Sequence, residues 1–204
     1  MNKESKDWTG NKKTAFVQLG ASNHSEKERE KDDFYATDPE SLKIFLKALK
    51  RDGIKLHQEI WECACGKGHL SEVLKAEGYT VWSTDLVDRG YGDATNIDFL
   101  RCREWRGDIL TNPPYKYAKE FVERALQITK ARSYTIMFLK IQFLEGKARR
   151  KLFDKNPPKY VYVNSQRQAC YINGDMSKKM SSPTCFCWYI WEKGYTGEPI
   201  IRWI

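Results

Sequence analysis

The sequence predicts an α/β protein with a mainly parallel, doubly wound sheet that ends in an antiparallel hairpin. From residue 34 onward, short apolar runs alternate with amphipathic segments, as they do in βαβ units. The 204 residues, of which 41% are hydrophobic, suit one domain with a sizeable core. The last two apolar runs, at residues 185–191 and 199–203, are joined by Gly194-Tyr195-Thr196-Gly197, which is a hairpin signal.

The elements follow in order along the chain. Residues 1–33 carry many charges and few apolar side chains, so we expect a flexible polar arm there and a single domain at residues 34–204. Asp38 followed by Pro39 predicts the start of a helix that continues through Leu49. Strands are expected at residues 60–63, 79–84, 109–111, 134–139 and 160–163, and helices at residues 70–76, 118–129 and 146–153.

The first strand-to-helix turn, Glu62-Cys63-Ala64-Cys65-Gly66-Lys67-Gly68, has the composition of a ligand-binding loop. Gly66 and Gly68 allow a tight turn and close approach of the backbone to a ligand. A dinucleotide fingerprint needs a third glycine, but Ser71 stands at that position, and Glu62 would repel a phosphate. The turn therefore favours a ligand with a positive charge, such as an amino-acid ammonium group.

Asp85 follows Glu62 by 23 residues, at the expected end of the next strand. An acid at this position commonly accepts hydrogen bonds from ribose hydroxyls. The two acids together predict a nucleoside without pyrophosphate that also carries a cationic group. S-adenosylmethionine has both features.

The string Asp108-Ile109-Leu110-Thr111-Asn112-Pro113-Pro114-Tyr115 follows another expected strand on the same edge of the sheet. The prolines lack backbone donors, so the Asn112 side-chain oxygen and the Pro113 carbonyl are both suited to accept from one amino group. Two such acceptors would stabilise positive charge on an adenine amino group as a methyl group arrives. Tyr115 offers a face on which a flipped base can stack.

Positive charge is concentrated in one segment of the chain. The formal charge is +8, and residues 140–180 hold ten Lys or Arg and three Asp or Glu, a net charge of +7. This is the footprint expected for a phosphate backbone, although solvated basic helices are also common. Candidate nucleic-acid contacts within residues 141–184 are Lys147, Arg149, Arg150, Lys151 and Arg167.

These motifs, in this order and spacing, resemble those of the small phage and prophage N6-adenine DNA methyltransferases of the Dam-like type, over residues 33–204. The resemblance implies a Rossmann-like methyltransferase fold, S-adenosylmethionine as cofactor and double-stranded DNA as partner. It implies a catalytic motif of Asn112, Pro113, Pro114 and Tyr115. The implied cofactor-binding residues are Phe34, Tyr35, Thr37, Glu62, Cys63, Ala64, Gly66, Gly68, Asp85, Asp98 and Phe99.

Within that resemblance, Asp98 would meet the amino group of the cofactor's adenine and Phe99 would pack on its ring. Residues 34–37 would close over the methionine end of the cofactor. Larger members of the family carry a separate target-recognition domain, and this chain has no room for one, so loops within residues 141–184 would have to read the DNA.

Several other classes of protein are compatible with the same residues. Asn-Pro-Pro-Tyr also occurs in enzymes that methylate RNA adenine or protein glutamine, because both substrates present a planar amino group. A cytosine-N4 enzyme and a catalytically silent nucleic-acid-binding module on the same fold are further alternatives. The concentrated positive charge favours nucleic acid over a protein substrate.

The hydropathy of the chain and the spacing of its cysteines give no sign of a membrane span, a secretory signal or a metal site. No apolar run is long enough to span a membrane, and the polar N-terminal sequence has no secretory signal, so we expect a cytoplasmic protein with reduced thiols. The six cysteines include two Cys-x-Cys pairs, whose spacing does not match the usual structural zinc sites, so no metal is expected.

A second Asn-Pro-Pro string occurs at residues 156–158, followed by Lys159 and Tyr160. It comes after an expected basic helix, and the aromatic residue is displaced by one place. We therefore expect its prolines to end the helix and lead into a strand, without a catalytic role.

Overall fold

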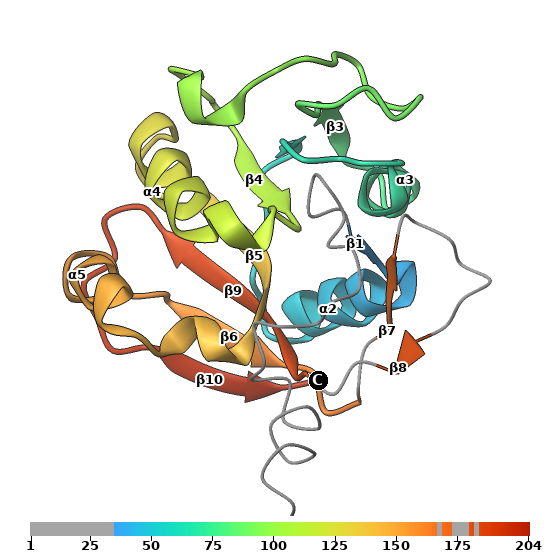
Figure 1. Cartoon of the computed structure of the whole chain (residues 1–204). Coiled ribbons are helices and arrows are strands. Elements are labelled where there is room, and N and C mark those ends of the chain that lie inside the picture. Colours follow the sequence, from blue (N-terminus) through green and yellow to red (C-terminus); the bar gives the residue numbers. More distant parts are fainter. Residues whose placement is uncertain (1–34, 167–168, 173–179, 182–183) are drawn as a thin grey trace, which may run out of the picture.

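The computed structural model describes residues 35–166, 169–172, 180–181 and 184–204 (Figure 1). A seven-stranded sheet with the order β10-β6-β9-β5-β4-β2-β3 forms the centre of the fold. Its strands are β2 (Glu59–Glu62), β3 (Thr80–Ser83), β4 (Asp108–Thr111), β5 (Tyr134–Lys140), β6 (Tyr160–Val163), β9 (Phe186–Glu192) and β10 (Ile200–Trp203).

The helices between these strands agree with the expected alternation. The α-helices are α2 (Pro39–Arg51), α3 (His69–Ala76), α4 (Ala118–Ile128) and α5 (Lys147–Lys155). The short 3-10 helices are η1 (Phe99–Arg101), η2 (Tyr115–Tyr117) and η3 (Ile141–Leu144). Asp38 caps α2 as predicted, because its side chain accepts a hydrogen bond from the Glu40 amide at 2.9 Å.

The predicted fold class is confirmed, since every strand of the large sheet is parallel to the others except β9. The pairing at the C-terminal end differs from the expected hairpin. Strands β9 and β10 run in opposite directions, but β6 lies between them. Residues 186–191 are buried on both faces of the sheet, which requires a central position, whereas β10 is an exposed edge strand.

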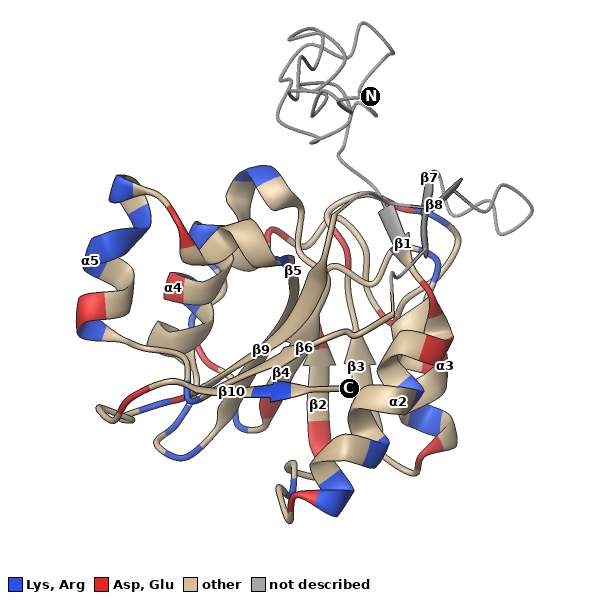
Figure 2. Ribbon diagram, turned by 90° about the horizontal axis from the view of Figure 1, so that it is seen from below, with Lys and Arg blue, Asp and Glu red and all other residues tan. Residues whose placement is uncertain are grey.

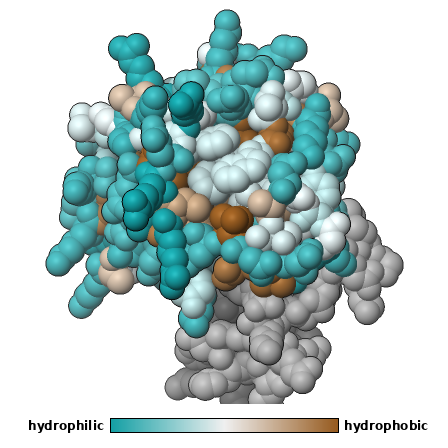
Figure 3. Space-filling view, turned by 90° about the horizontal axis from the view of Figure 1, so that it is seen from above, coloured by the Kyte–Doolittle hydropathy of each residue, from teal (hydrophilic) through white to brown (hydrophobic). Residues whose placement is uncertain are grey.

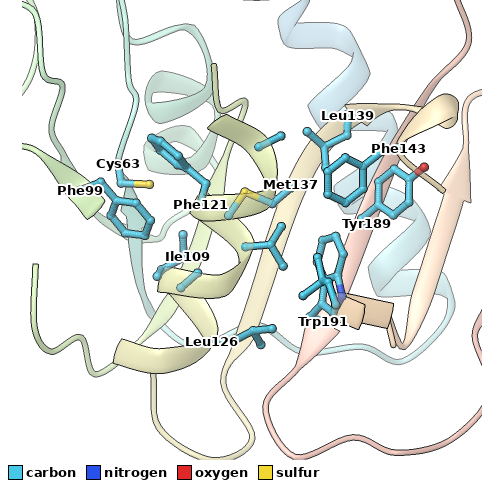
Figure 4. Close-up of a cluster of buried hydrophobic side chains, with 14 of the residues drawn as sticks. Cys63, Phe99, Ile109, Phe121, Leu126, Met137, Leu139, Phe143, Tyr189 and Trp191 are labelled. Carbon is cyan, nitrogen blue, oxygen red and sulfur yellow. The ribbon is translucent and has the colours of Figure 1, made fainter. Parts of the chain in front are cut away.

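The sheet is covered by helices on both faces (Figure 1). Helices α2 and α3 pack on one face, and α4 and α5 pack on the other. In β5 the side chains alternate between the two cores. Figure 4 shows part of the core between the sheet and helices α4 and α5. There Phe121 and Leu126 of α4 lie near Ile109 and Met137 of the sheet.

The second Asn-Pro-Pro string separates a helix from a strand, as the sequence predicts. Asn156 is the C-cap of α5, and its amide donates to the Leu152 carbonyl at 2.7 Å. The two prolines then lead into β6, and the Asn156 carbonyl accepts a hydrogen bond from Trp191 Nε1 at 3.1 Å. This string therefore ends a helix and begins a strand.

A small three-stranded sheet was not predicted. Strand β1 (Tyr35–Thr37) pairs antiparallel with β7 (Ala169–Ile172), which pairs antiparallel with β8 (Met180–Ser181). These strands are too short to produce a periodic pattern, and their pairing joins residues far apart in the sequence. The sheet brings the segment before α2 beside the segment that follows β6.

Part of the apolar surface stays exposed. The face in Figure 3 is mostly hydrophilic with a small apolar area near its centre. The exposed large apolar side chains among the described residues are Trp82, Leu86, Tyr117, Leu144, Ile200, Ile201 and Trp203. In the described part of the chain, no helix has the length and apolar character needed to cross a membrane.

Asp108, the first residue of β4, ties three segments together at the edge opposite the candidate site. Its fully buried carboxylate accepts hydrogen bonds from His57 N, His57 Nδ1 and Tyr134 N, each at 2.7 Å. Burial raises the pKa of Asp108, and the hydrogen bonds from Tyr134 and His57 oppose that rise. The carboxylate therefore holds the loop before β2 and the start of β5 against β4.

We expect Asp108→Asn to lower the free energy of unfolding by about 2 kcal/mol, because the new amide places N–H groups against buried donors. Urea denaturation monitored by tryptophan fluorescence measures the change. Asp154→Asn is the matched control, since Asp154 is exposed and pairs with Arg150 on the same helix. A loss for Asp108→Asn no larger than that of the control would contradict this role.

Candidate active site

Three of the predicted site residues lie along one edge of the sheet. Glu62 ends β2, Asp85 follows β3 and Asn112 follows β4. Because these strands are parallel, their carboxyl ends meet at the same edge, where open α/β sheets bind ligands. Backbone hydrogen bonds join the segments after β2 and β3, from Thr84 N to the Glu62 carbonyl at 2.9 Å and from Cys65 N to the Thr84 carbonyl at 3.0 Å.

The two glycines of the first turn are required by the structure. Gly66 has φ +56° and Gly68 has φ +82°, both in the left-handed region that favours glycine. A Cβ at Gly68 would also lie 2.3 Å from the ring of Tyr91. Tyr91 is held over the turn by α3, since its hydroxyl donates to Glu72 Oε1 at 2.6 Å and accepts from Lys75 Nζ at 3.0 Å. The sequence indicated the turn, but not the residue that covers it.

Asp85 holds this turn in place. Its Oδ2 accepts a hydrogen bond from Gly66 N at 2.8 Å, and its Oδ1 accepts from Val87 N at 2.9 Å. The carboxylate is largely buried. Each carboxylate oxygen has a second lone pair, so the same group retains the capacity to accept from a ligand hydroxyl. The side chain thus connects the glycine turn with the position at which a ribose was predicted.

Glu62 faces the interior, away from solvent. Its side chain is 2% exposed and accepts a hydrogen bond from the Ser71 hydroxyl, which also contacts Ser83 Oγ at 2.7 Å. Burial raises the pKa of Glu62 to about 8, although the hydrogen bonds from Ser71 act in the opposite direction. In this structure the carboxyl joins β2 to α3, a role that the sequence did not indicate. The ammonium contact expected for it remains a proposal.

The next two residues of the turn lie below it. Cys63 is 1% exposed and belongs to the core, and Ala64 is partly buried against the same cluster. Cys63 therefore supports the turn from beneath. In the ranges that the structure covers, no group of three or more His, Cys, Asp or Glu could hold a metal ion.

Asn112 connects the Asn-Pro-Pro-Tyr motif with the upstream segment. Its Nδ2 donates a hydrogen bond to Thr37 Oγ1 at 2.9 Å, across 75 residues of sequence. Thr37 is 3% exposed and ends β1, so the small sheet places this hydroxyl at the motif. The bond fixes the orientation of the amide plane. It also brings Thr37, expected at the cofactor, together with Asn112.

The rest of the motif turns from β4 into α4. Pro113 is buried, and the Pro114 carbonyl accepts from Tyr117 N at 2.9 Å as η2 begins. Tyr115 is partly buried, with its ring centroid 6.0 Å from that of Phe186. Lys140 Nζ lies 5.0 Å from the centre of the Tyr115 ring. The sequence predicted Tyr115, but its pattern did not single out Lys140 as its neighbour.

Asp98 and Phe99 have structural contacts of their own. Asp98 caps η1 through the Leu100 amide at 3.0 Å and pairs with Arg101 at 3.1 Å. Phe99 is 2% exposed, and the centroid of its ring lies 5.1 Å from that of Trp61. The ring of Phe121 is also close, with 4.9 Å between the two centroids (Figure 4). The structure therefore places Phe99 in the core and not on the surface of the site, because it fills the space between β2 and α4. In this arrangement its ring has almost no area for a cofactor to pack on.

The predicted nucleic-acid contacts differ in how they are held. Lys and Arg positions are frequent along the ribbon of α5 (Figure 2). Of these residues, Lys147 and Lys151 are exposed. Arg150 is exposed and pairs with Asp154 at 2.6 Å. Arg149 instead donates to the carbonyls of η3 and the following turn, at Gln142, Phe143 and Glu145. The sequence could not distinguish this structural arginine from its neighbours, because the distinction depends on how η3 folds back.

Two of the predicted residues cannot be placed. Phe34 and Arg167 lie outside the described residues. Tyr35 belongs to β1, where it pairs with Ile172. The expectations for the polar arm at residues 1–33 also fall outside the described part of the chain.

The raised pKa of Glu62 predicts a pH dependence of stability. The folded protein retains a proton that the unfolded chain, with a carboxyl pKa near 4.3, releases. Folding is therefore favoured at low pH, and this contribution is lost as the pH rises toward about 8. Glu62→Gln imitates the protonated form. As the pH rises, we expect the unfolding free energy of the wild type to fall relative to that of Glu62→Gln. The fall should be at most about 1.4 kcal/mol per pH unit.

Urea denaturation at pH 5.5, 6.5 and 7.5 measures this difference. Glu123→Gln is the control, because Glu123 is on the surface of α4 and pairs with Lys119 at 3.1 Å. Parallel pH curves for the wild type and Glu62→Gln would show that Glu62 is ionised throughout this range.

Comparison with known proteins supports the fold. No protein-family model matches the chain, and no curated protein matches its sequence. Among solved structures, one similar protein is described as a candidate RNA methyltransferase from Pyrococcus horikoshii, with a TM-score of 0.57 and 15% identity over 89% of this chain and 98% of that one.

Two further structures are similar over nearly the whole chain. One is a candidate class I S-adenosylmethionine-dependent methyltransferase from Listeria monocytogenes, with a TM-score of 0.55 and 13% identity over 95% of this chain and 72% of that one. The other is a modification subunit of a candidate type I restriction enzyme from Vibrio vulnificus, with a TM-score of 0.57 and 12% identity over 95% of this chain and 50% of that one. The chain therefore has the Rossmann-like fold of the class I S-adenosylmethionine-dependent methyltransferases.

Proposed function

We propose that this protein transfers a methyl group from S-adenosylmethionine to the N6 amino group of adenine in double-stranded DNA. The observation that carries the proposal is the position of Asn112. It follows β4 within an Asn-Pro-Pro-Tyr motif, its amide is oriented by Thr37, and the glycine turn held by Asp85 lies at the same edge of the sheet. The fold shared with class I methyltransferases supports the same chemistry.

The residues at this edge fit the proposed cofactor. The glycine turn and Asp85 suit a nucleoside, because the turn allows close approach of the backbone and the Asp85 carboxylate can accept from ribose hydroxyls. When bound, S-adenosylmethionine supplies an electrophilic methyl group. The chain supplies the binding surface, with Gly66 and Gly68 allowing close approach of the backbone and Tyr91 keeping the turn in place.

In the proposed reaction the target adenine stacks on Tyr115, out of the duplex. The Asn112 side-chain oxygen and the Pro113 carbonyl accept hydrogen bonds from its amino group and stabilise the positive charge that develops there. With the cofactor bound, the adenine nitrogen would take the methyl group as the sulfur–carbon bond breaks, and would then release a proton to water. The Thr37 hydroxyl orients the Asn112 amide for this role.

Charge and similarity support nucleic acid as the partner. The exposed cations of α5 lie on the helix that follows η3, which starts from the carboxyl end of β5. A modification subunit of a candidate restriction enzyme has the same fold, which favours DNA. RNA adenine is the second candidate substrate, because another protein of this fold is described as a candidate RNA methyltransferase. Both substrates present the same amino group.

We expect purified protein with labelled S-adenosylmethionine to label unmethylated duplex DNA, and nucleoside mass spectrometry to identify the product as N6-methyladenine. Structured RNA and bulk cellular protein are assayed in parallel. Label in RNA alone, in protein or in methylcytosine would refute the assignment to DNA adenine.

We expect Asn112→Ala to lower turnover by about two to three powers of ten, because an acceptor for developing charge is removed. Equilibrium binding of S-adenosylmethionine should remain within a few-fold of the wild type. The matched control is Asn156→Ala, which alters the other Asn-Pro-Pro string at the end of α5 and should retain wild-type turnover. Near-normal turnover of Asn112→Ala would remove this residue from the mechanism.

A further inference from the structure

Lys140 is the last residue of β5, and its ammonium group lies over the aromatic ring of the Asn-Pro-Pro-Tyr motif. The distance from Nζ to the centre of the Tyr115 ring is 5.0 Å, within the range of a cation–π interaction. The Lys140 side chain is exposed, so its charge remains accessible to an anion from solvent. Before any nucleic acid binds, the ammonium occupies the ring on which a base would have to stack.

The backbone of Lys140 is anchored on both sides. Lys140 pairs with Phe186 in the neighbouring strand β9, and its carbonyl accepts a hydrogen bond from the Tyr189 hydroxyl at 3.2 Å. The next amide, Ile141 N, donates to the Cys185 carbonyl at 2.9 Å. The Cα position is therefore rigid, and only the flexible four-carbon stem can carry the ammonium to a new partner.

The Lys140 ammonium has to leave the Tyr115 ring before the proposed reaction, for two reasons. A base would compete with Nζ for the Tyr115 face. Methyl transfer to an amino group also develops positive charge at the acceptor nitrogen, which a nearby ammonium would oppose. The ammonium group of a lysine is a compact charge on a flexible side chain. It is therefore suited to bind the phosphate beside an extruded nucleotide.

We propose that Lys140 is a nucleic-acid-positioning residue that moves from the ring of Tyr115 to a backbone phosphate next to the target nucleotide. This inference rests on the proposed function of the site and names a further residue for it. The Lys140 side chain thereby covers the Tyr115 ring in the free protein and contacts the nucleic acid in the complex. It adds to the candidate contacts on α5 a cation directly at the motif.

The test compares Lys140→Met, which keeps the length of the stem, with Lys140→Arg, which keeps the charge. We expect Lys140→Met to raise the KM for unmethylated duplex DNA about tenfold, as for the loss of one charged hydrogen bond. Its affinity for S-adenosylmethionine and its melting temperature should not change. For a mixed-sequence duplex of 30 base pairs, the slope of log affinity against log salt should become about 0.9 less steep, which corresponds to one phosphate contact. Lys140→Arg should restore most of both losses.

Lys130→Met is the matched control, because this exposed lysine precedes the opposite end of the same strand. A Lys140→Met enzyme with the KM and salt slope of the control would overturn the proposal, as would an equal loss in Lys140→Arg. A wild-type protein that methylates no adenine in DNA would instead refute the proposed function, and the salt slopes measured by binding alone would still decide whether Lys140 contacts a phosphate.

Discussion

The parallel alignment of β2, β4 and β5 is the constraint on which the site depends. In this register Trp61 lies opposite Ile109, and Thr111 lies opposite Met137, so the three strands end at the same edge. The residues that follow or end them therefore converge although they are far apart in sequence. Helices on both faces bury the apolar residues of these strands, and a shift of one residue in any strand would turn its apolar side chains toward the wrong core.

Several polar groups at this edge are already engaged in holding the fold. Asp85 binds the amide of Gly66, and Glu62 joins β2 to α3 through Ser71. A ligand that uses these groups meets acceptors whose positions are already determined, which lowers the entropic cost of ordering them on binding. The same arrangement means that substitutions of these acids would affect folding as well as ligand affinity.

The motif at Asn112 joins parts of the chain that do not neighbour one another in the large sheet. Thr37 reaches it from the small sheet, while Tyr115 packs near Phe186 of β9 and under the ammonium of Lys140. Strand β1 also pairs with β7, so the segment that follows β6 is connected through β1 to the position of Asn112. This connection provides a route by which the segment after β6 can influence the proposed catalytic motif.

Much of this protein could be predicted from its sequence. Alternating apolar runs determined the parallel sheet, glycines with Ser71 and Asp85 indicated a ligand turn, and the residues before each Asn-Pro-Pro string separated the two copies. These features depend on local conformation or on the period of a single element. Only the tertiary structure decided that β6 separates β9 from β10, that Arg149 supports η3, that Phe99 fills the core and that Lys140 lies over Tyr115. Each of these depends on which distant segment packs against the residue. The type of a residue and its spacing from its neighbours do not specify that segment.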